Sequence, residues 1–210
     1  MQYDFNWTSS NLTTCLPIYL ALFGFIIYWF SSKSLRIKSL FEKNNNTDDA
    51  SIKHILFCKF SGLFWMGIVP IILAVYFLKG YTFSDFGLYI NAETSLLSLY
   101  WIIGLSIPLV PLVSFSARQE KNLKNYPQIR AKVWSKNLKL KNAIGWAAYL
   151  FGYELLFRGV LLFPLADELG VWIAIAINIA LYSATHIPKG LDETIGAIPL
   201  GLVLCILTLY

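Results

Sequence analysis

The sequence predicts an all-α protein, a polytopic bundle of transmembrane helices. Of its 210 residues, 57% are hydrophobic and only 14% are charged, and the mean hydropathy is +0.58. A soluble domain of this size cannot bury so much apolar surface in one core. The third observation is a series of six apolar runs, each long enough or nearly so to cross about 30 Å of hydrocarbon. These runs are 15–30, 61–78, 96–115, 143–165, 170–186 and 194–210.

The chain divides into two parts on this basis. Segment 1–142 is an N-terminal membrane region with three spans and two basic cytoplasmic loops, and segment 143–210 holds the other three spans. The last run ends on CILTLY at Tyr210 without a polar flank. We therefore expect the sequence to be truncated, with one or two further helices beyond Tyr210.

The basic residues gather in alternate connections between the expected spans. The connection 31–54 carries five of them, and the connection 116–142 carries eight basic residues against the single acid Glu120. Only Lys79 lies between the second and third spans. By the positive-inside rule, both basic loops face the cytoplasm and the N-terminus lies outside. The net charge of +5 thus reflects orientation in the membrane, and no nucleic-acid partner is implied.

A glutamate and an arginine lie inside the fourth expected span. Glu154 and Arg158 fall within about 40° of each other on a helix, so their side chains can pair. Placing a charged group at this depth of the membrane costs at least about 3 kcal/mol, and such groups usually mark functional sites. Gly145, Gly152 and Gly159 form a stripe on nearly the opposite side, where a neighbouring helix can approach closely. The charged pair fits two interpretations equally, a lock on helix packing or part of an active site.

The fifth expected span carries a polar stripe within about 100° of arc. The stripe consists of Asn178, Tyr182, Thr185 and His186. Pro188 disfavours helix at the residue before it, which places His186 in or near the last turn, at the expected cytoplasmic end. With the charged helix, the stripe predicts a buried polar pocket supported by Asn178 and Tyr182. The other histidine, His54, falls in a basic loop.

Two short motifs in this region resemble those of a known family. The stretch Tyr153-Glu154-Leu-Leu-Phe-Arg158-Gly159 matches a Glu-Glu-x-x-x-Arg element followed by glycine, and Tyr182-Ser-Ala-Thr-His186 matches Phe-x-x-x-His. Their order, spacing and placement on successive helices resemble the CAAX prenyl protease and bacteriocin-processing family of intramembrane endopeptidases, also called CPBP or Abi-type proteins. The resemblance covers about 145–210, so segment 143–210 is expected to be a partial protease core.

The resemblance implies a set of site residues. Glu154 and Arg158 correspond to the second glutamate and the arginine of the first motif, and His186 to the histidine of the second. In that family the first glutamate is taken to activate a water for attack on a peptide carbonyl. The histidine, with a His-x-x-x-Asn or His-x-x-x-Asp element on a later helix, holds a metal or the oxyanion. The implied cofactor is zinc or another divalent metal, bound by His186 together with ligands beyond Tyr210.

Two positions depart from the family pattern. Tyr153 stands where the family has its water-activating glutamate, and Tyr182 where phenylalanine is usual. A phenol is a poor base at neutral pH, so we expect Glu154 to act as the base and count Tyr153 as a candidate catalytic residue. On ideal untilted helices the backbones of Glu154 and His186 would also differ in height by about 10 Å. Tilt, a kink or a water-filled cavity must bring them together.

The expected function is intramembrane endoproteolysis, the hydrolysis of a peptide bond in a peptide or protein substrate at the membrane. The protein is expected to be integral to a bacterial plasma membrane, with the substrate and the lipid bilayer as its partners. The alternative is a catalytically inactive family member, a membrane immunity or scaffold protein that uses Glu154 and Arg158 to hold helices together. A small transporter is a third class, and no sequence repeat supports it. The sequence carries no prediction of oligomeric state.

Overall fold

The computed structural model describes residues 5–43, 45–124 and 126–210, and within these ranges all regular structure is helical, without a strand. Six helices are long and apolar enough to cross a membrane, which confirms the predicted fold class. These helices are Ser9–Lys33, Thr47–Phe77, Thr94–Ser116, Lys136–Leu169, Val171–Lys189 and Leu191–Leu209.

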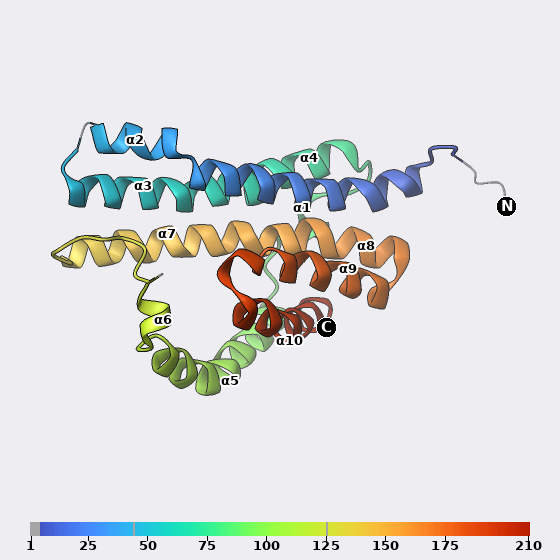
Figure 1. The fold of residues 1–210 in the computed structure, drawn as a ribbon. Helices are drawn as coiled ribbons and strands as arrows, with labels where there is room; N and C mark the ends of the chain where they lie inside the picture. The colour runs from blue at the N-terminus through green and yellow to red at the C-terminus, as the bar shows by residue number, and fades with distance from the viewer. Residues whose placement is uncertain (1–4, 44, 125) are drawn as a thin grey trace.

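Two long helices form the centre of the bundle (Figure 1). One consists of α3 (Thr47–Gly62) and α4 (Val69–Phe77), and the other of α7 (Lys136–Glu154) and α8 (Phe163–Leu169). The N-terminal helix α1 (Ser9–Lys33) packs against both of them. Figure 1 shows these helices running side by side.

The remaining helices lie around this centre. The hairpin of α9 (Val171–Ala184) and α10 (Leu191–Leu209) packs on the side of α8. By contrast, α5 (Ala92–Ser116) lies apart from the central helices in Figure 1, and no residue in its apolar window is buried. Two short helices, α2 (Leu35–Lys43) and α6 (Glu120–Leu123), lie in the two basic connections.

Both central helices contain a π-helical segment, in which hydrogen bonds run from residue i to i+5. The segment η1 (Leu63–Ile68) joins α3 to α4, and η3 (Leu155–Leu162) joins α7 to α8. The two segments contact each other. Every residue of η3 is buried, although it carries the arginine of the charged pair.

The glycine stripe of α7 meets α3 closely, as its spacing predicted. A Cβ on Gly152 would lie 2.7 Å from the Cα atom of Leu63, and a Cβ on Gly145 would lie 3.1 Å from the Leu56 side chain. The third glycine, Gly159, instead faces the backbone oxygen of Phe86, at 2.9 Å from its would-be Cβ. Phe86 belongs to the 3₁₀ helix η2 (Phe83–Phe86), which lies between α4 and α5.

The placement of His54 in a loop was wrong. The helix α3 begins at Thr47, well before the apolar run at 61, so His54 lies within it. Its N-terminus is stabilised by Asn46, whose side chain accepts a hydrogen bond from the amide of Asp49, and by acidic residues in the first turn. With 31 residues, the helix Thr47–Phe77 is about 46 Å long and exceeds the hydrocarbon thickness. Its polar first half therefore projects beyond the membrane core.

Candidate functional site

The charged pair of α7 and η3 is part of a buried network with α9. Arg158 Nε lies 3.4 Å from Glu154 Oε2, and the Arg158 side chain is only 8% exposed whereas that of Glu154 is 40% exposed. Arg158 Nη1 donates to Asn178 Oδ1 at 3.2 Å. The side-chain amide of Asn178 in turn donates to the backbone oxygen of Phe157. Asn178 thus fixes α9 to the π-helical segment and satisfies one donor of the arginine.

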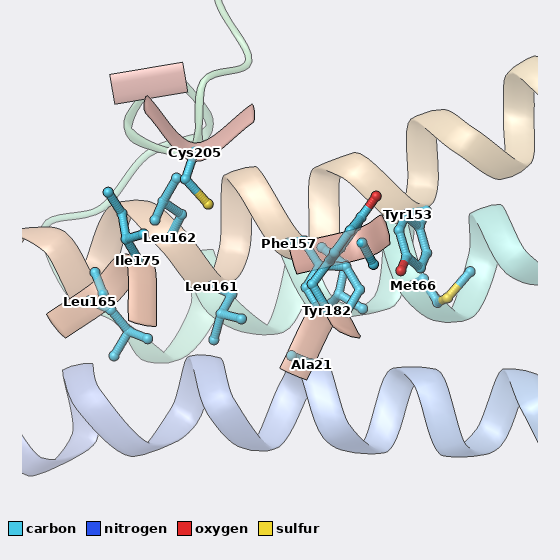
Figure 2. Packing of buried hydrophobic residues seen from close by; sticks show 13 residues of the cluster. Ala21, Met66, Tyr153, Phe157, Leu161, Leu162, Leu165, Ile175, Tyr182 and Cys205 are labelled. Carbon is cyan, nitrogen blue, oxygen red and sulfur yellow. The ribbon is translucent and has the colours of Figure 1, made fainter. Parts of the chain in front are cut away.

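The ring of Tyr182 lies between this network and the histidine. The guanidinium carbon of Arg158 lies 4.4 Å from the ring centroid, a cation–π geometry. The ring centroid of Tyr182 also lies 5.5 Å from that of Tyr153 and 5.0 Å from that of His186. Figure 2 shows Tyr182, Tyr153 and Phe157 gathered at this place. Tyr182 therefore separates the charged pair from the histidine side chain.

Tyr153, Thr185 and His186 form the second polar group of the site. The end of α9 creates it, because the His186 amide bonds the oxygen of Ser183 rather than continuing the helix, which leaves the Tyr182 oxygen free. Two side chains contact this backbone oxygen instead. Thr185 Oγ1 donates to it at 2.7 Å, and His186 Nδ1 lies 2.9 Å from it.

The protonation of this group follows from its partners. A carbonyl oxygen only accepts, so His186 Nδ1 carries the hydrogen, and in the neutral ring Nε2 keeps a free lone pair. The hydroxyl hydrogen of Thr185 is directed at the Tyr182 oxygen. Tyr153, whose hydroxyl oxygen lies 2.7 Å from Thr185 Oγ1, is therefore the donor of that bond. The network holds a histidine with one nitrogen available as a base or ligand.

This second group lies on the wall of a large cavity. Its volume is about 900 Å³, and its lining includes Tyr153, Thr185 and His186 but none of Glu154, Arg158, Asn178 or Tyr182. The rest of the lining comes from the end of α1, from α2 and α3, from the connection before α7, from α7 itself, and from Pro188, Lys189 and Glu193 at the turn between α9 and α10. We call the end of the bundle built by 31–54 and 116–142 the basic end, and the cavity belongs to it.

The charge of the cavity is mainly positive. Its charged lining consists of Lys33, Lys38, Lys59, Lys124, Arg130, Lys189, Glu42 and Glu193. Tyr126 also lines it, and burial, with a smaller effect from the charge of Glu193, raises the pKa of this phenol above its usual value. The phenol therefore adds no negative charge at physiological pH, and the excess of lysine and arginine side chains favours a ligand with negative charge in this space.

The described residues do not assemble a complete zinc site around His186. Within 5–43, 45–124 and 126–210 no group of three or more histidine, cysteine, aspartate or glutamate side chains could hold a metal ion. A zinc ion in a protein takes at least three such ligands. We therefore derive no chemical step through a metal.

The structure separates the predicted site residues into two sets. Tyr153 and His186 meet at the cavity, with ring centroids 6.3 Å apart, whereas Glu154 and Arg158 lie behind Tyr182. The difference in height of about 10 Å was expected between the backbones of Glu154 and His186, and it was counted from the end of the apolar run at 143. The helix α7 begins earlier, at Lys136, and the ring of Tyr153, the residue before Glu154, reaches His186.

Sequence reasoning missed Lys59, which is buried and lines the cavity. It lies two residues before the apolar run that begins at 61, and lysines at that place usually flank a span. The signal that could have indicated its burial is its spacing. Lys59, Gly62 and Met66 lie three and four residues apart, and the last two face the core.

A comparison with protein families identifies the C-terminal part of the chain. Residues 141–210 match the family model described as Type II CAAX prenyl endopeptidase Rce1-like. The match includes both motifs and all of η3, α8, α9 and α10. No curated protein and no solved structure matches the chain. The C-terminal third of the chain is thus similar to the CAAX prenyl endopeptidase family, which confirms the resemblance carried by the two motifs.

Proposed function

We propose that the chain is a membrane-embedded endopeptidase that hydrolyses a peptide bond at the inner wall of the cavity. One observation carries the proposal: Tyr153, Thr185 and His186 are joined by hydrogen bonds on the wall of a 900 Å³ cavity in the part of the chain that matches a prenyl endopeptidase family. With the N-terminus outside, as the charge pattern predicts, this cavity lies at the cytoplasmic end of the bundle.

The geometry supports general acid–base catalysis by His186. Nε2 of the neutral ring can take a proton from a water that attacks the peptide carbonyl, and the same nitrogen can then protonate the leaving amine. The hydrogen bond from Nδ1 to the Tyr182 oxygen fixes the ring orientation during both transfers. The hydroxyl of Tyr153, which now donates to Thr185, is a candidate donor to the oxygen that becomes negative in the tetrahedral intermediate.

Glu154 has a different role in this proposal from the base that the resemblance implies. Its side chain does not line the cavity and is paired with Arg158, so in this proposal Glu154 stabilises the arrangement of the helices and takes no part in the reaction. This observation also favours the second candidate function, a non-catalytic scaffold or immunity protein. There the network of Arg158 and Asn178 would serve only to hold α9 against η3.

A cleavage assay separates the two functions. The first substrate is a farnesylated peptide ending in a CAAX sequence, with a fluorophore and a quencher on opposite sides of the scissile bond, added to the purified chain in lipid bilayers. His186→Gln is expected to lower the cleavage rate by about 100-fold or more and Tyr153→Phe by about 10-fold to 100-fold, while both variants keep a cooperative unfolding transition above the assay temperature.

The matched control is His54→Gln, because His54 is the second histidine of the chain and lines the same cavity without contacting the His186 network. Its rate should stay within about twofold of that of the unmodified protein. Full activity of His186→Gln would refute the assignment of this histidine. If the unmodified protein cleaves neither this peptide nor a panel of other membrane-anchored peptides, the scaffold function is supported instead.

A further inference from the structure

Lys59 is a buried lysine inside a membrane-spanning helix. It is only 4% exposed and lies on α3, where α3 packs against α7. Its Nζ atom lies 3.0 Å from the ring centroid of Trp146 and 4.8 Å from that of Tyr149. Its stem lies against Gly145, where a Cβ would be 3.4 Å from the Lys59 Cγ atom. The helix contact thus places the ammonium group in an aromatic corner of the cavity.

The aromatic contacts do not replace the water that Lys59 has lost. Removing an ammonium group from water costs more free energy than cation–π contacts with one or two rings return. A buried lysine therefore either pairs with an anion or loses its proton, and an anion bound beside it favours the charged form. The missing partner has to be sought among the groups that share the cavity.

Neither carboxylate of the cavity lining fills this role. Glu42 pairs with Lys38 at 3.4 Å, and Glu193 pairs with Lys189 at 3.5 Å. Among the described residues, no carboxylate lies within 4.0 Å of Lys59. The cavity therefore has a buried amine that no carboxylate of the described residues pairs with.

The surroundings of Lys59 indicate the class of anion. Tryptophan and tyrosine rings together with lysine and arginine side chains line the cavity, the combination found where helices leave the hydrocarbon and meet lipid headgroups. Basic pockets between membrane helices at the cytoplasmic side bind phosphate-containing headgroups. An ammonium group also serves as a point charge for phosphate.

We propose that the Lys59 corner of the cavity binds the phosphate of an anionic membrane lipid. The bound headgroup occupies the space next to Trp146 and Tyr149, and Lys33 and Arg130, elsewhere on the lining, add to the positive charge of the cavity. The binding goes beyond the proposed peptidase activity and does not depend on it. Binding is therefore measured without a substrate.

The test measures lipid binding to the purified chain in neutral detergent. Phosphatidylglycerol, phosphatidylcholine and inorganic phosphate are titrated separately, and both the unfolding midpoint and the number of retained lipids by native mass spectrometry are recorded. Phosphatidylglycerol should bind at least about tenfold more tightly than phosphatidylcholine. Lys59→Met should weaken phosphatidylglycerol binding about tenfold, and Lys59→Arg should retain most of it.

The matched control is Lys53→Met, which removes an exposed lysine from the same helix outside the cavity lining. Equal binding of phosphatidylglycerol to the Lys59→Met and Lys53→Met variants would overturn the proposal. If Lys59→Met does not fold, equal affinity of the unmodified protein for the two lipids overturns it, and a tenfold preference for phosphatidylglycerol supports it. A midpoint shift by inorganic phosphate as large as that by phosphatidylglycerol would assign the site to soluble phosphate and overturn the lipid assignment.

Discussion

The close contact between α3 and α7 leads to a sharp prediction for Gly152→Ala. The added Cβ would lie 2.7 Å from Leu63 Cα, 3.2 Å from Gly62 O and 3.3 Å from Leu63 N. All three atoms belong to the backbone, so no side-chain rotation relieves the contact. The two helices must separate, or one of them must shift along its axis.

The magnitude follows from two opposing effects. Overpacking of a well-packed contact costs about 1–3 kcal/mol, and a clash with backbone falls at the upper end. Alanine in place of glycine returns up to about 1 kcal/mol of helix propensity. The net loss in free energy of unfolding should be about 2 kcal/mol, which is roughly a thirtyfold change in the unfolding equilibrium. Equilibrium unfolding in mixed micelles, followed by circular dichroism, measures it.

The chain offers a matched control in Gly196→Ala on α10, where a Cβ would meet no atom within 4 Å. That variant should be as stable as the unmodified protein or more stable by up to about 1 kcal/mol. If Gly152→Ala and Gly196→Ala shift the unfolding free energy equally, the close packing of α3 on α7 is not what the structure indicates.

Three further predictions concern hydrogen bonds. Asn178→Leu should lower the free energy of unfolding by about 3 kcal/mol in the same assay, because the buried arginine loses its hydrogen-bond acceptor. Thr185→Val leaves the Tyr153 hydroxyl without its acceptor and should cost about 1–2 kcal/mol, whereas no loss would mean that water replaces the threonine. Hydrogen bonds from the side chain and backbone of Thr82 hold the pKa of the Asp85 carboxyl below its usual value, so the stability it gives to its turn is complete above the unfolded pKa and disappears as the pH falls through the folded one. The protection of the amides in that turn, measured as the exchange rate relative to the intrinsic rate at the same pH, should fall in acid, and Asp85→Asn should remove this dependence.

The spans could be predicted from the sequence because hydrophobicity alone fixes where a helix can cross a bilayer. Their ends could not, because polar caps extend the helices past the apolar runs. Asn46 starts α3 far before residue 61, and Ser135, which accepts from the Leu138 amide, starts α7 before residue 143. These extensions are what build the walls of the cavity, so the cavity itself was not predictable from the apolar pattern.

The sequence predicted most of the residues of the candidate site but only part of their arrangement in space. The pairing of Glu154 with Arg158 followed from helical spacing and is confirmed. The meeting of Tyr153 with His186 was missed because the helices were measured from their outer ends. Counted from Gly170, where α8 turns into α9, Glu154 and His186 are each sixteen residues away, which brings antiparallel helices level. Tyr153 precedes Glu154 by one residue, so its side chain points about 100° away from that of Glu154 and faces the histidine.

The two π-helical segments limit how this protein can vary. Each wide turn accommodates one residue more than a regular α-helix would, and such turns commonly arise by insertion of a single residue. Deleting one residue from 155–162 would close the wide turn and leave the residues after it near their present direction, whereas a deletion in the regular turns of α7 would rotate them by about 100° relative to the glycine stripe. The facing segment 63–68 carries the same irregularity at the same contact. Single-residue deletions within these two segments should therefore be tolerated better than deletions in the regular turns of α7 or α3.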